Sequence, residues 1–285
     1  MKDRNIHALY GLKWNPFARE VPVHALKSPP QADRFFWQVE HLAFDGGFGL
    51  LSGASGSGKS SVMRLLEQRI SNVGGIAIAK IDRAQSNLRD FYLELGEAFG
   101  VSFKTGNRYG GFKRLRMEWL KQISAATFRP FLLIDEAQAM PTEVLSEIRV
   151  LGSHDFDSRC ILAVVLAGDQ RLPARLRDDE ELVPLDTRMR ARLVVESQTC
   201  EELIALLTHA TSVAGAPDLL TPGVKSVLAE HANGSPRAMM SQANDLLAYA
   251  AEKEARCIDE QLLFDFDGSK FKQRPKLPRH NPRGE

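Results

Sequence analysis

The sequence predicts an α/β fold in which helices cover both faces of a parallel sheet, followed by a small all-helical domain and a basic tail. Short apolar runs alternate with helical periodicity over residues 46–197, which is typical of a parallel sheet with helical crossovers. After Val195 only helical patterns follow. We therefore expect an N-terminal segment and helix over 1–45, an α/β domain over 46–197, a helical lid over 198–267 and a disordered basic tail over 268–285.

Five apolar runs are the predicted strands, at residues 48–51, 76–81, 131–134, 161–166 and 193–195. Helical periodicity predicts helices between them, near 59–71, 87–99, 112–126 and 142–151, and one before them over 31–44. The lid is expected to hold helices over 201–213, 221–231 and 236–254. The last 16 residues carry six Lys or Arg, three Pro and a single acidic residue, which favours disorder.

Composition narrows the class of protein. The chain has 285 residues, of which 44% are hydrophobic and 26% charged, as in soluble globular proteins. A net charge of +1 means that binding to nucleic acid would need a local basic patch. The three widely spaced cysteines suggest no disulfide framework, and we find neither a signal peptide nor an apolar run near the roughly 18 residues of a membrane span. We expect a cytoplasmic protein with no membrane partner.

The run Gly53-Ala54-Ser55-Gly56-Ser57-Gly58-Lys59-Ser60 fits the phosphate-binding loop G-x-x-x-x-G-K-[ST] between a strand and a helix. Glycines let successive backbone N–H groups face phosphate oxygens, and the helix N-terminus adds partial positive charge. Lys59 supplies a point charge for the β/γ-phosphates, and the Ser60 hydroxyl suits Mg²⁺. The predicted ATP-binding residues of this segment are Gly53, Ser55, Gly56, Ser57, Gly58, Lys59, Ser60 and Ser61.

The strand Phe131–Ile134 ends in Asp135 and Glu136, which has the form of a Walker B motif. We predict that Asp135 holds Mg²⁺ together with Ser60, and that Glu136 polarises the water that attacks the γ-phosphate. An acidic turn at a strand edge is the alternative, and the phosphate loop makes it the weaker one.

Later polar residues extend the predicted site. Asp169 or Gln170 follows the fourth strand, where a polar side chain can sense the γ-phosphate; a capping turn is the alternative. One of three arginines, Arg188, Arg190 or Arg192, can reach the nucleotide of a neighbouring subunit, and a solvated basic turn is the alternative. Arg237, at the start of a lid helix, can reach back to the γ-phosphate or be an ordinary surface residue.

Residues 103–116 carry five Lys or Arg and no acid around a Gly-rich loop. Such a segment can track a phosphate backbone without reading bases, and an ordinary solvated helix face is the alternative. The candidate contacts for double-stranded DNA are Lys104, Arg108, Lys113 and Arg114.

Together these features resemble AAA+ ATPases, in particular the group that holds the secretion-linked ExeA-type ATPases and the target-selecting ATPases of bacterial transposons. The similarity is carried by the opening Tyr10-Gly11-Leu12-Lys13-Trp14-Asn15-Pro16-Phe17, by Asp135-Glu136-Ala137-Gln138 with the helix after it, by Val165-Leu166-Ala167-Gly168 and by Gly234-Ser235-Pro236-Arg237. It covers about residues 8–250.

The resemblance implies a P-loop AAA+ sheet with a helical lid, ATP and Mg²⁺ as ligands, and a ring or helical filament that assembles on DNA and recruits a transposase. It implies Glu136, Asp169 and Arg188 as catalytic residues, with Arg188 acting in a neighbouring subunit. Asp169 departs from the group, which has a neutral polar residue there. The secretion-type members carry a membrane segment, so the sequence favours the transposition type; a secretion ATPase and an ATP-binding scaffold with little turnover are the alternatives.

Overall fold

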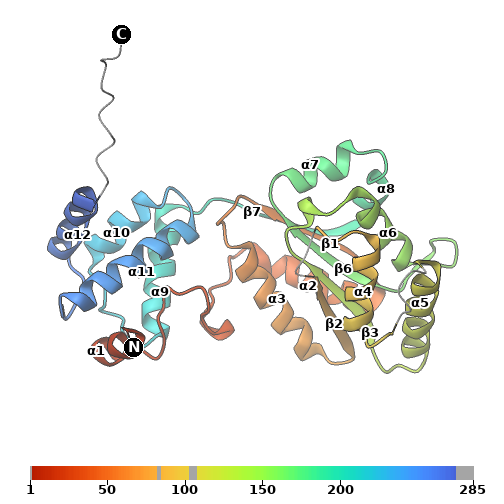
Figure 1. Ribbon diagram of the computed structural model, residues 1–285, viewed down its shortest axis with the longest axis horizontal. Helices are drawn as coiled ribbons and strands as arrows, with labels where there is room; N and C mark the ends of the chain where they lie inside the picture. The colour runs from red at the N-terminus through yellow and green to blue at the C-terminus, as the bar shows by residue number, and fades with distance from the viewer. Residues whose placement is uncertain (1, 82–84, 103–107, 274–285) are drawn as a thin grey trace, which may run out of the picture. The chain divides into compact units, whose positions relative to one another are not determined.

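The computed structural model describes residues 2–81, 85–102 and 108–273. They form two compact units, one of residues 28–197 and the other of residues 1–27 with 198–285, and each unit is described by itself. The first unit holds the sheet and the second is helical (Figure 1). The predicted N-terminal segment of residues 1–45 is divided in the structure, where residues 1–27 belong to the helical unit and residues 28–45 to the unit with the sheet.

The sheet has five parallel strands in the order β2-β3-β6-β1-β7. This is the parallel α/β architecture that the sequence predicts. The strands of this sheet are β1 (Gly47–Gly53), β2 (Ile76–Ile81), β3 (Arg129–Ile134), β6 (Ala163–Gly168) and β7 (Met189–Val195).

Helices cover both faces of the sheet (Figure 1). On one face, α2 (Ala32–Asp45) and α3 (Lys59–Val73) bury Val39 and Leu66 against alternate strand residues such as Val165. The other face packs against the helices α4 (Leu88–Ala98), α5 (Arg108–Ser124), α6 (Thr142–Gly152), α7 (Arg171–Asp178) and α8 (Val183–Asp186). Consecutive strand residues point to opposite faces, so the apolar runs of the sequence are buried on both sides.

Helices α7 and α8 of this unit were not predicted, and two features of its strands also differ from the prediction. Strand β7 begins at Met189 rather than Leu193. As an edge strand it alternates buried Ala191 with exposed Arg190 and Arg192, so it lacks a continuous apolar run. A short hairpin, β4 (Ser153–His154) with β5 (Arg159–Cys160), was not predicted, because strands of two residues leave no periodicity to read.

The helical unit holds α1 (Lys2–Tyr10), α9 (Cys200–Val213), α10 (Pro222–His231), α11 (Pro236–Glu252) and α12 (Glu260–Gln273). Thr199 caps α9 in a capping box with Glu202, and the Ser235 hydroxyl caps α11. Helix α12 runs through residue 273, so the predicted start of the tail at 268 falls inside a helix. Residues 274–285 lie outside the described part of the chain.

The motif Tyr10–Phe17 has a structural role in this unit. Leu12 and Phe17 are buried in the same core as Leu203 of α9, and the Asn15 amide donates to Asn244 Oδ1 of α11 at 2.8 Å. The motif therefore joins the start of the chain to the helical unit by packing and a side-chain hydrogen bond.

Candidate nucleotide-binding site

The phosphate loop connects β1 to α3. Gly56 and Gly58 have φ values of 81° and 108°, which residues other than glycine rarely adopt. Gly53, the last residue of β1, is needed for a different reason, because a Cβ there would lie 2.4 Å from the Val195 carbonyl oxygen of β7. Glycine thus permits both the turn of the loop and its close approach to the neighbouring strand.

Lys59 and Ser57 give this loop the properties of an anion site. The Lys59 side chain is only 7% exposed, and its ammonium donates to the Gly53 and Ala54 carbonyls at 3.0 and 2.9 Å. Ser57 Oγ is buried and has no hydrogen-bond partner among the described residues. The N-terminus of α3 has no side-chain cap. A phosphate fits this set of unsatisfied donors and fixed positive charge.

Asp135 and Glu136 follow β3 at the same edge of the sheet as the phosphate loop, because all the strands of this sheet are parallel. Asp135 is half-buried and Oδ1 accepts the Glu136 N–H at 2.8 Å, while Glu136 is exposed with φ of 53°. Ser60 is exposed at the start of α3. A hydroxyl and a carboxylate are hard oxygen ligands of the kind Mg²⁺ prefers beside substrate phosphates, so Ser60 and Asp135 fit that ion.

Asp169 follows β6, the strand between β1 and β3. Hydrogen bonds from Arg171 hold the pKa of Asp169 below its ordinary value, and the nearby charge of Lys59 lowers it further. Asp169 is therefore ionised near neutral pH, and the guanidinium of Arg171 balances its charge. Gln170 is exposed at the start of α7, and its side chain does not cap that helix.

Two further residues, not predicted as site residues, make contacts at this end of the strands. Gln138 Nε2 donates to Glu136 Oε2 at 2.5 Å, and Gln138 Oε1 accepts the Asp169 N–H at 3.1 Å. Arg175 of α7 donates to the carbonyls of Gln138 and Met140 at 3.0 and 2.5 Å. Gln138 belongs to the Asp-Glu-Ala-Gln stretch that carries the resemblance, and its place in that stretch could have indicated a role in the site.

Of the three candidate arginines, Arg188 and Arg190 lie near the start of β1, at the opposite end of the strands from the phosphate loop, and Arg192 pairs with Leu50 in the middle of β1. Arg188 immediately precedes β7, whose first residue Met189 pairs with Phe48 near the start of β1, while the phosphate loop follows the end of β1. Strands rise about 3.3 Å per residue, so roughly 20 Å of sheet separates Arg188 from the loop of its own chain. Arg188 contacts Asp157 and the Pro184 carbonyl, and Arg192 pairs with Asp186 at 2.8 Å. Arg190 is exposed.

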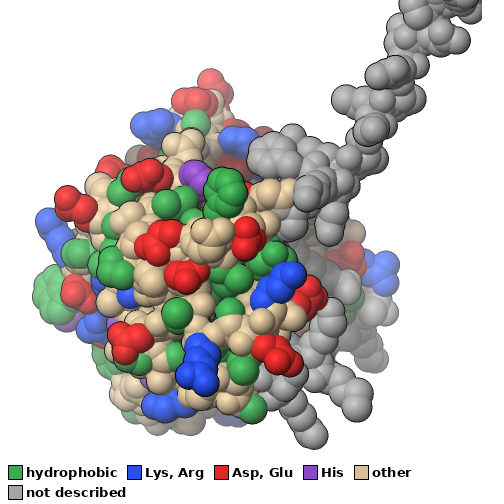
Figure 2. All heavy atoms as spheres, turned by 90° about the vertical axis from the view of Figure 1, so that its left-hand side faces the viewer, with side chains coloured by type: hydrophobic (Ala, Val, Ile, Leu, Met, Phe, Trp, Pro, Cys, Tyr) green, Lys and Arg blue, Asp and Glu red, His purple; other side chains and the backbone are tan. Residues whose placement is uncertain are grey.

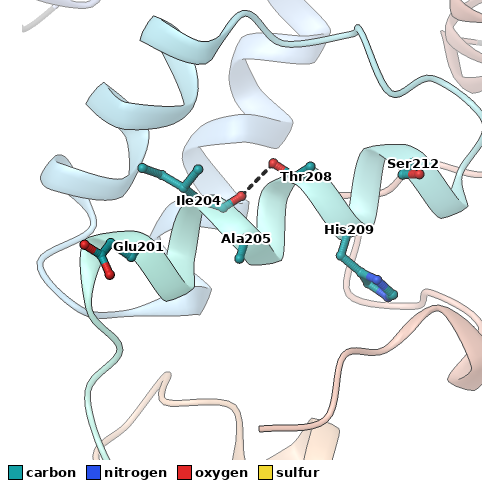
Figure 3. Close-up of a pocket in the computed structure, with 6 residues that line it drawn as sticks. All are labelled: Glu201, Ile204, Ala205, Thr208, His209 and Ser212. Carbon is teal, nitrogen blue, oxygen red and sulfur yellow. Dashed lines mark hydrogen bonds between the residues drawn. The ribbon is translucent and has the colours of Figure 1, made fainter. Parts of the chain in front are cut away.

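Arg237 is the second residue of α11 and is exposed in the helical unit. That unit also carries an open depression of about 540 Å³ along α9. Figure 3 shows its lining residues Glu201, Ile204, Ala205, Thr208, His209 and Ser212 along one side of that helix. The Thr208 hydroxyl donates a hydrogen bond to the Ile204 carbonyl at 2.9 Å. Among the described residues, no group of three or more His, Cys, Asp or Glu side chains is arranged to hold a metal ion.

The candidate DNA contacts are described only in part. Lys104 lies outside the described residues, and Arg108 begins α5 without a described side chain. Lys113 and Arg114 are exposed on α5, and Arg114 donates to the Ser102 carbonyl at 2.7 Å. Arg116, part of the same basic segment, donates to the Val150 and Leu151 carbonyls at the end of α6, so it serves the fold. The face of the helical unit in Figure 2 intersperses acidic and basic side chains.

The sheet order and the loop geometry define a P-loop fold of the AAA+ class. Residues 41–176 match a family model described as an AAA domain. Over 194 residues the chain is 30% identical to general secretion pathway protein A of Aeromonas hydrophila. The match covers 67% of this chain and 35% of that protein, so the chain spans about a third of that relative's length.

Solved structures share the fold at low sequence identity. Cdc6p of Pyrobaculum aerophilum superposes with a TM-score of 0.71 at 16% identity, over 85% of this chain and 67% of that one. The ORC1 protein of Aeropyrum pernix, solved in complex with DNA, gives 0.64 at 20% identity, over 88% and 68%. In the described part of the chain, no helix is both long and apolar enough to cross a membrane.

Proposed function

We propose that this chain is an ATP hydrolase that assembles with copies of itself on double-stranded DNA when ATP is bound, and that it selects target DNA for a transposase. The observation that carries the proposal is the separation between Arg188 and the phosphate loop. An arginine at the opposite end of the strands from the phosphate loop is better placed to contact the nucleotide of a neighbouring subunit than that of its own chain.

Within one subunit, the phosphate loop with Lys59 binds and orients the phosphates. Ser60 and Asp135 would hold Mg²⁺, which would neutralise part of the phosphate charge. Glu136 accepts a proton from the attacking water, and its exposed carboxylate at the end of β3 suits that role. Arg188 stabilises developing charge in the adjacent subunit.

DNA binding is assigned to the basic segment around α5. Lys113 and Arg114 are exposed there, and Lys104 and Arg108 extend the charge along the sequence. The ORC1 structure was solved with DNA, which supports a nucleic-acid partner for this fold. The transposase partner rests on the sequence resemblance to transposon target-selecting ATPases.

The similarity to general secretion pathway protein A favours a second candidate, an assembly ATPase whose client is a protein. ATPase rates with and without duplex DNA distinguish the two. Stimulation by DNA supports the first function, and turnover indifferent to DNA supports the second. ATP-dependent assembly without turnover would instead indicate a nucleotide-binding scaffold. A change of target-site choice by the cognate transposase, dependent on this protein, tests the transposition role directly.

A further inference from the structure

Gln138 links two parts of the nucleotide site through one side chain. Its Nε2 donates to Glu136 Oε2 at 2.5 Å, and its Oε1 accepts the Asp169 N–H at 3.1 Å. A backbone N–H can only donate, so the amide oxygen must face Asp169 and the NH₂ group must face Glu136. The orientation of the amide is therefore determined by its partners, and the bridge runs from the end of β3 to the end of β6.

The surroundings of Gln138 fix this bridge in place. Arg175 holds its backbone by donating to the Gln138 and Met140 carbonyls at 3.0 and 2.5 Å, and to Thr142 Oγ1 at 2.8 Å. Gly168 leaves room for the amide, because a Cβ at that position would lie 2.6 Å from Gln138 Oε1. The Gln138 side chain thus lies between the loop that Arg175 holds by hydrogen bonds and Gly168, the last residue of β6.

We propose that Gln138 is a positioning residue that orients the carboxylate of Glu136. Glu136 is exposed and long, so it has many rotamers to lose when it adopts one geometry. The charge-assisted bond from Gln138 holds Oε2, and Oε1 has no hydrogen-bond partner in the part of the chain that the structure describes. Oε1 is then the oxygen presented to water. This inference rests on the proposed ATP hydrolysis.

The bridge predicts an effect on turnover rather than on ATP affinity. Gln138 bonds to Glu136 and to the backbone after β6, and not to the Lys59 ammonium, which is bonded to the Gly53 and Ala54 carbonyls. Gln138→Met keeps the length of the side chain and removes both bonds. Gln138→Glu keeps an acceptor for the Asp169 N–H but replaces the donor with a negative charge facing Glu136.

A matched control exists on α5, where Gln122 Nε2 donates to Glu118 Oε1 at 2.5 Å. In the purified full chain with saturating duplex DNA, we expect Gln138→Met and Gln138→Glu each to lower kcat by about tenfold or more. The Kd for ATP should change by less than about twofold. Gln122→Met should change neither quantity.

Amide hydrogen exchange of the nucleotide-free protein tests the geometry apart from activity. The Asp169 amide should exchange faster in Gln138→Met, and should stay protected in Gln138→Glu and in Gln122→Met. Unchanged exchange in Gln138→Met overturns the bridge. Normal wild-type turnover with wild-type or raised kcat in Gln138→Met overturns the positioning role alone, whereas absent wild-type turnover overturns the proposed function and this role with it.

Discussion

The guanidinium of Arg188 pairs with the carboxylate of Asp157, which belongs to the hairpin that connects β4 to β5. Arg188 also donates to the Pro184 carbonyl. Beside Asp157, Phe156 is fully exposed, and the hairpin residues Asp155, Phe156 and Asp157 all have positive φ values of 50–71°. The residue proposed to complete a neighbour's site is thus held, within its own subunit, by an exposed turn.

Arg188→Ala should leave ATP binding by the single subunit intact and depress hydrolysis by the assembled protein, because Arg188 lies far from its own phosphate loop. Mixing provides the measurement. Subunits with Arg188→Ala and subunits with Glu136→Gln should restore part of the activity together, since each completes a site for the other. Asp157→Asn should preserve or raise activity, as it frees Arg188. Absence of any restoration would point to Arg190, to Arg192 or to a site that is not shared.

Lys59→Ala should weaken ATP binding by about 10- to 150-fold, the range for losing hydrogen bonds to a charged group. Isothermal titration calorimetry measures the affinity. Lys253→Ala, an exposed lysine of the helical unit, is the control and should bind ATP normally. Because the Lys59 ammonium also bonds the Gly53 and Ala54 carbonyls, thermal unfolding should accompany the titration. Wild-type affinity in folded Lys59→Ala would contradict the assignment of the phosphate loop.

Glu136→Gln should bind ATP with an affinity within about twofold of wild type and lower turnover by about 10²- to 10⁴-fold, because an amide cannot accept the proton of the attacking water. Gln138 can still donate to the new carbonyl oxygen, so the local structure should persist. Single-turnover kinetics with bound ATP separates binding from chemistry. Hydrolysis at the normal rate would exclude Glu136 as the base.

Arg171→Ala should reduce affinity for ATP severalfold more than affinity for ADP, if Asp169 senses the γ-phosphate as proposed, because the ionised Asp169 then has no counter-charge from Arg171. Asp169→Asn combined with Arg171→Ala should recover most of that loss. An equal loss for ATP and ADP, or no recovery in the double variant, would show that Arg171 acts in another way.

The pH dependence of this effect has a definite sign. Arg171 lowers the pKa of Asp169, so the contribution of the pair is present above the ordinary pKa of an aspartate and is lost as pH falls through the lowered value. Between about pH 6 and 8, the difference in ATP affinity between Arg171→Ala and wild type should therefore stay constant. Titrations at several pH values check this.

Reversing Lys113 and Arg114 to Glu should weaken ATP-dependent DNA binding without changing ATP affinity of the single subunit. Each lost phosphate contact should lower the slope of log K against log salt by about 0.9. Lys225→Glu with Lys253→Glu changes the net charge equally in the helical unit and serves as the control. A normal salt slope after the α5 reversal would move the DNA contact elsewhere, with the C-terminal basic residues as the next candidate.

Local patterns determine the parallel sheet and the approximate positions of its buried strands. A buried strand such as β3 appears in the sequence as a continuous apolar run. The spacing of the glycines before Lys59 is typical of a phosphate-binding loop and is rare in other structures. The edge strand β7 was predicted only in its last part, because its alternating arginines follow the exposed face of the sheet. Helix α1 was missed, since it packs with α11 through contacts distant in sequence.

By itself, the sequence determined the class of fold, the phosphate loop and the two carboxylates after β3, because each depends on a pattern of residues that are close together in the chain. Only the tertiary structure decided which distant groups meet. It paired Asp169 with Arg171 and set Gln138 between Glu136 and the end of β6. It also placed Arg188 at the edge of the sheet away from Lys59 and used Arg116 to cap α6. Strand order and contacts between residues distant in sequence set these relationships, and neither is encoded in local periodicity.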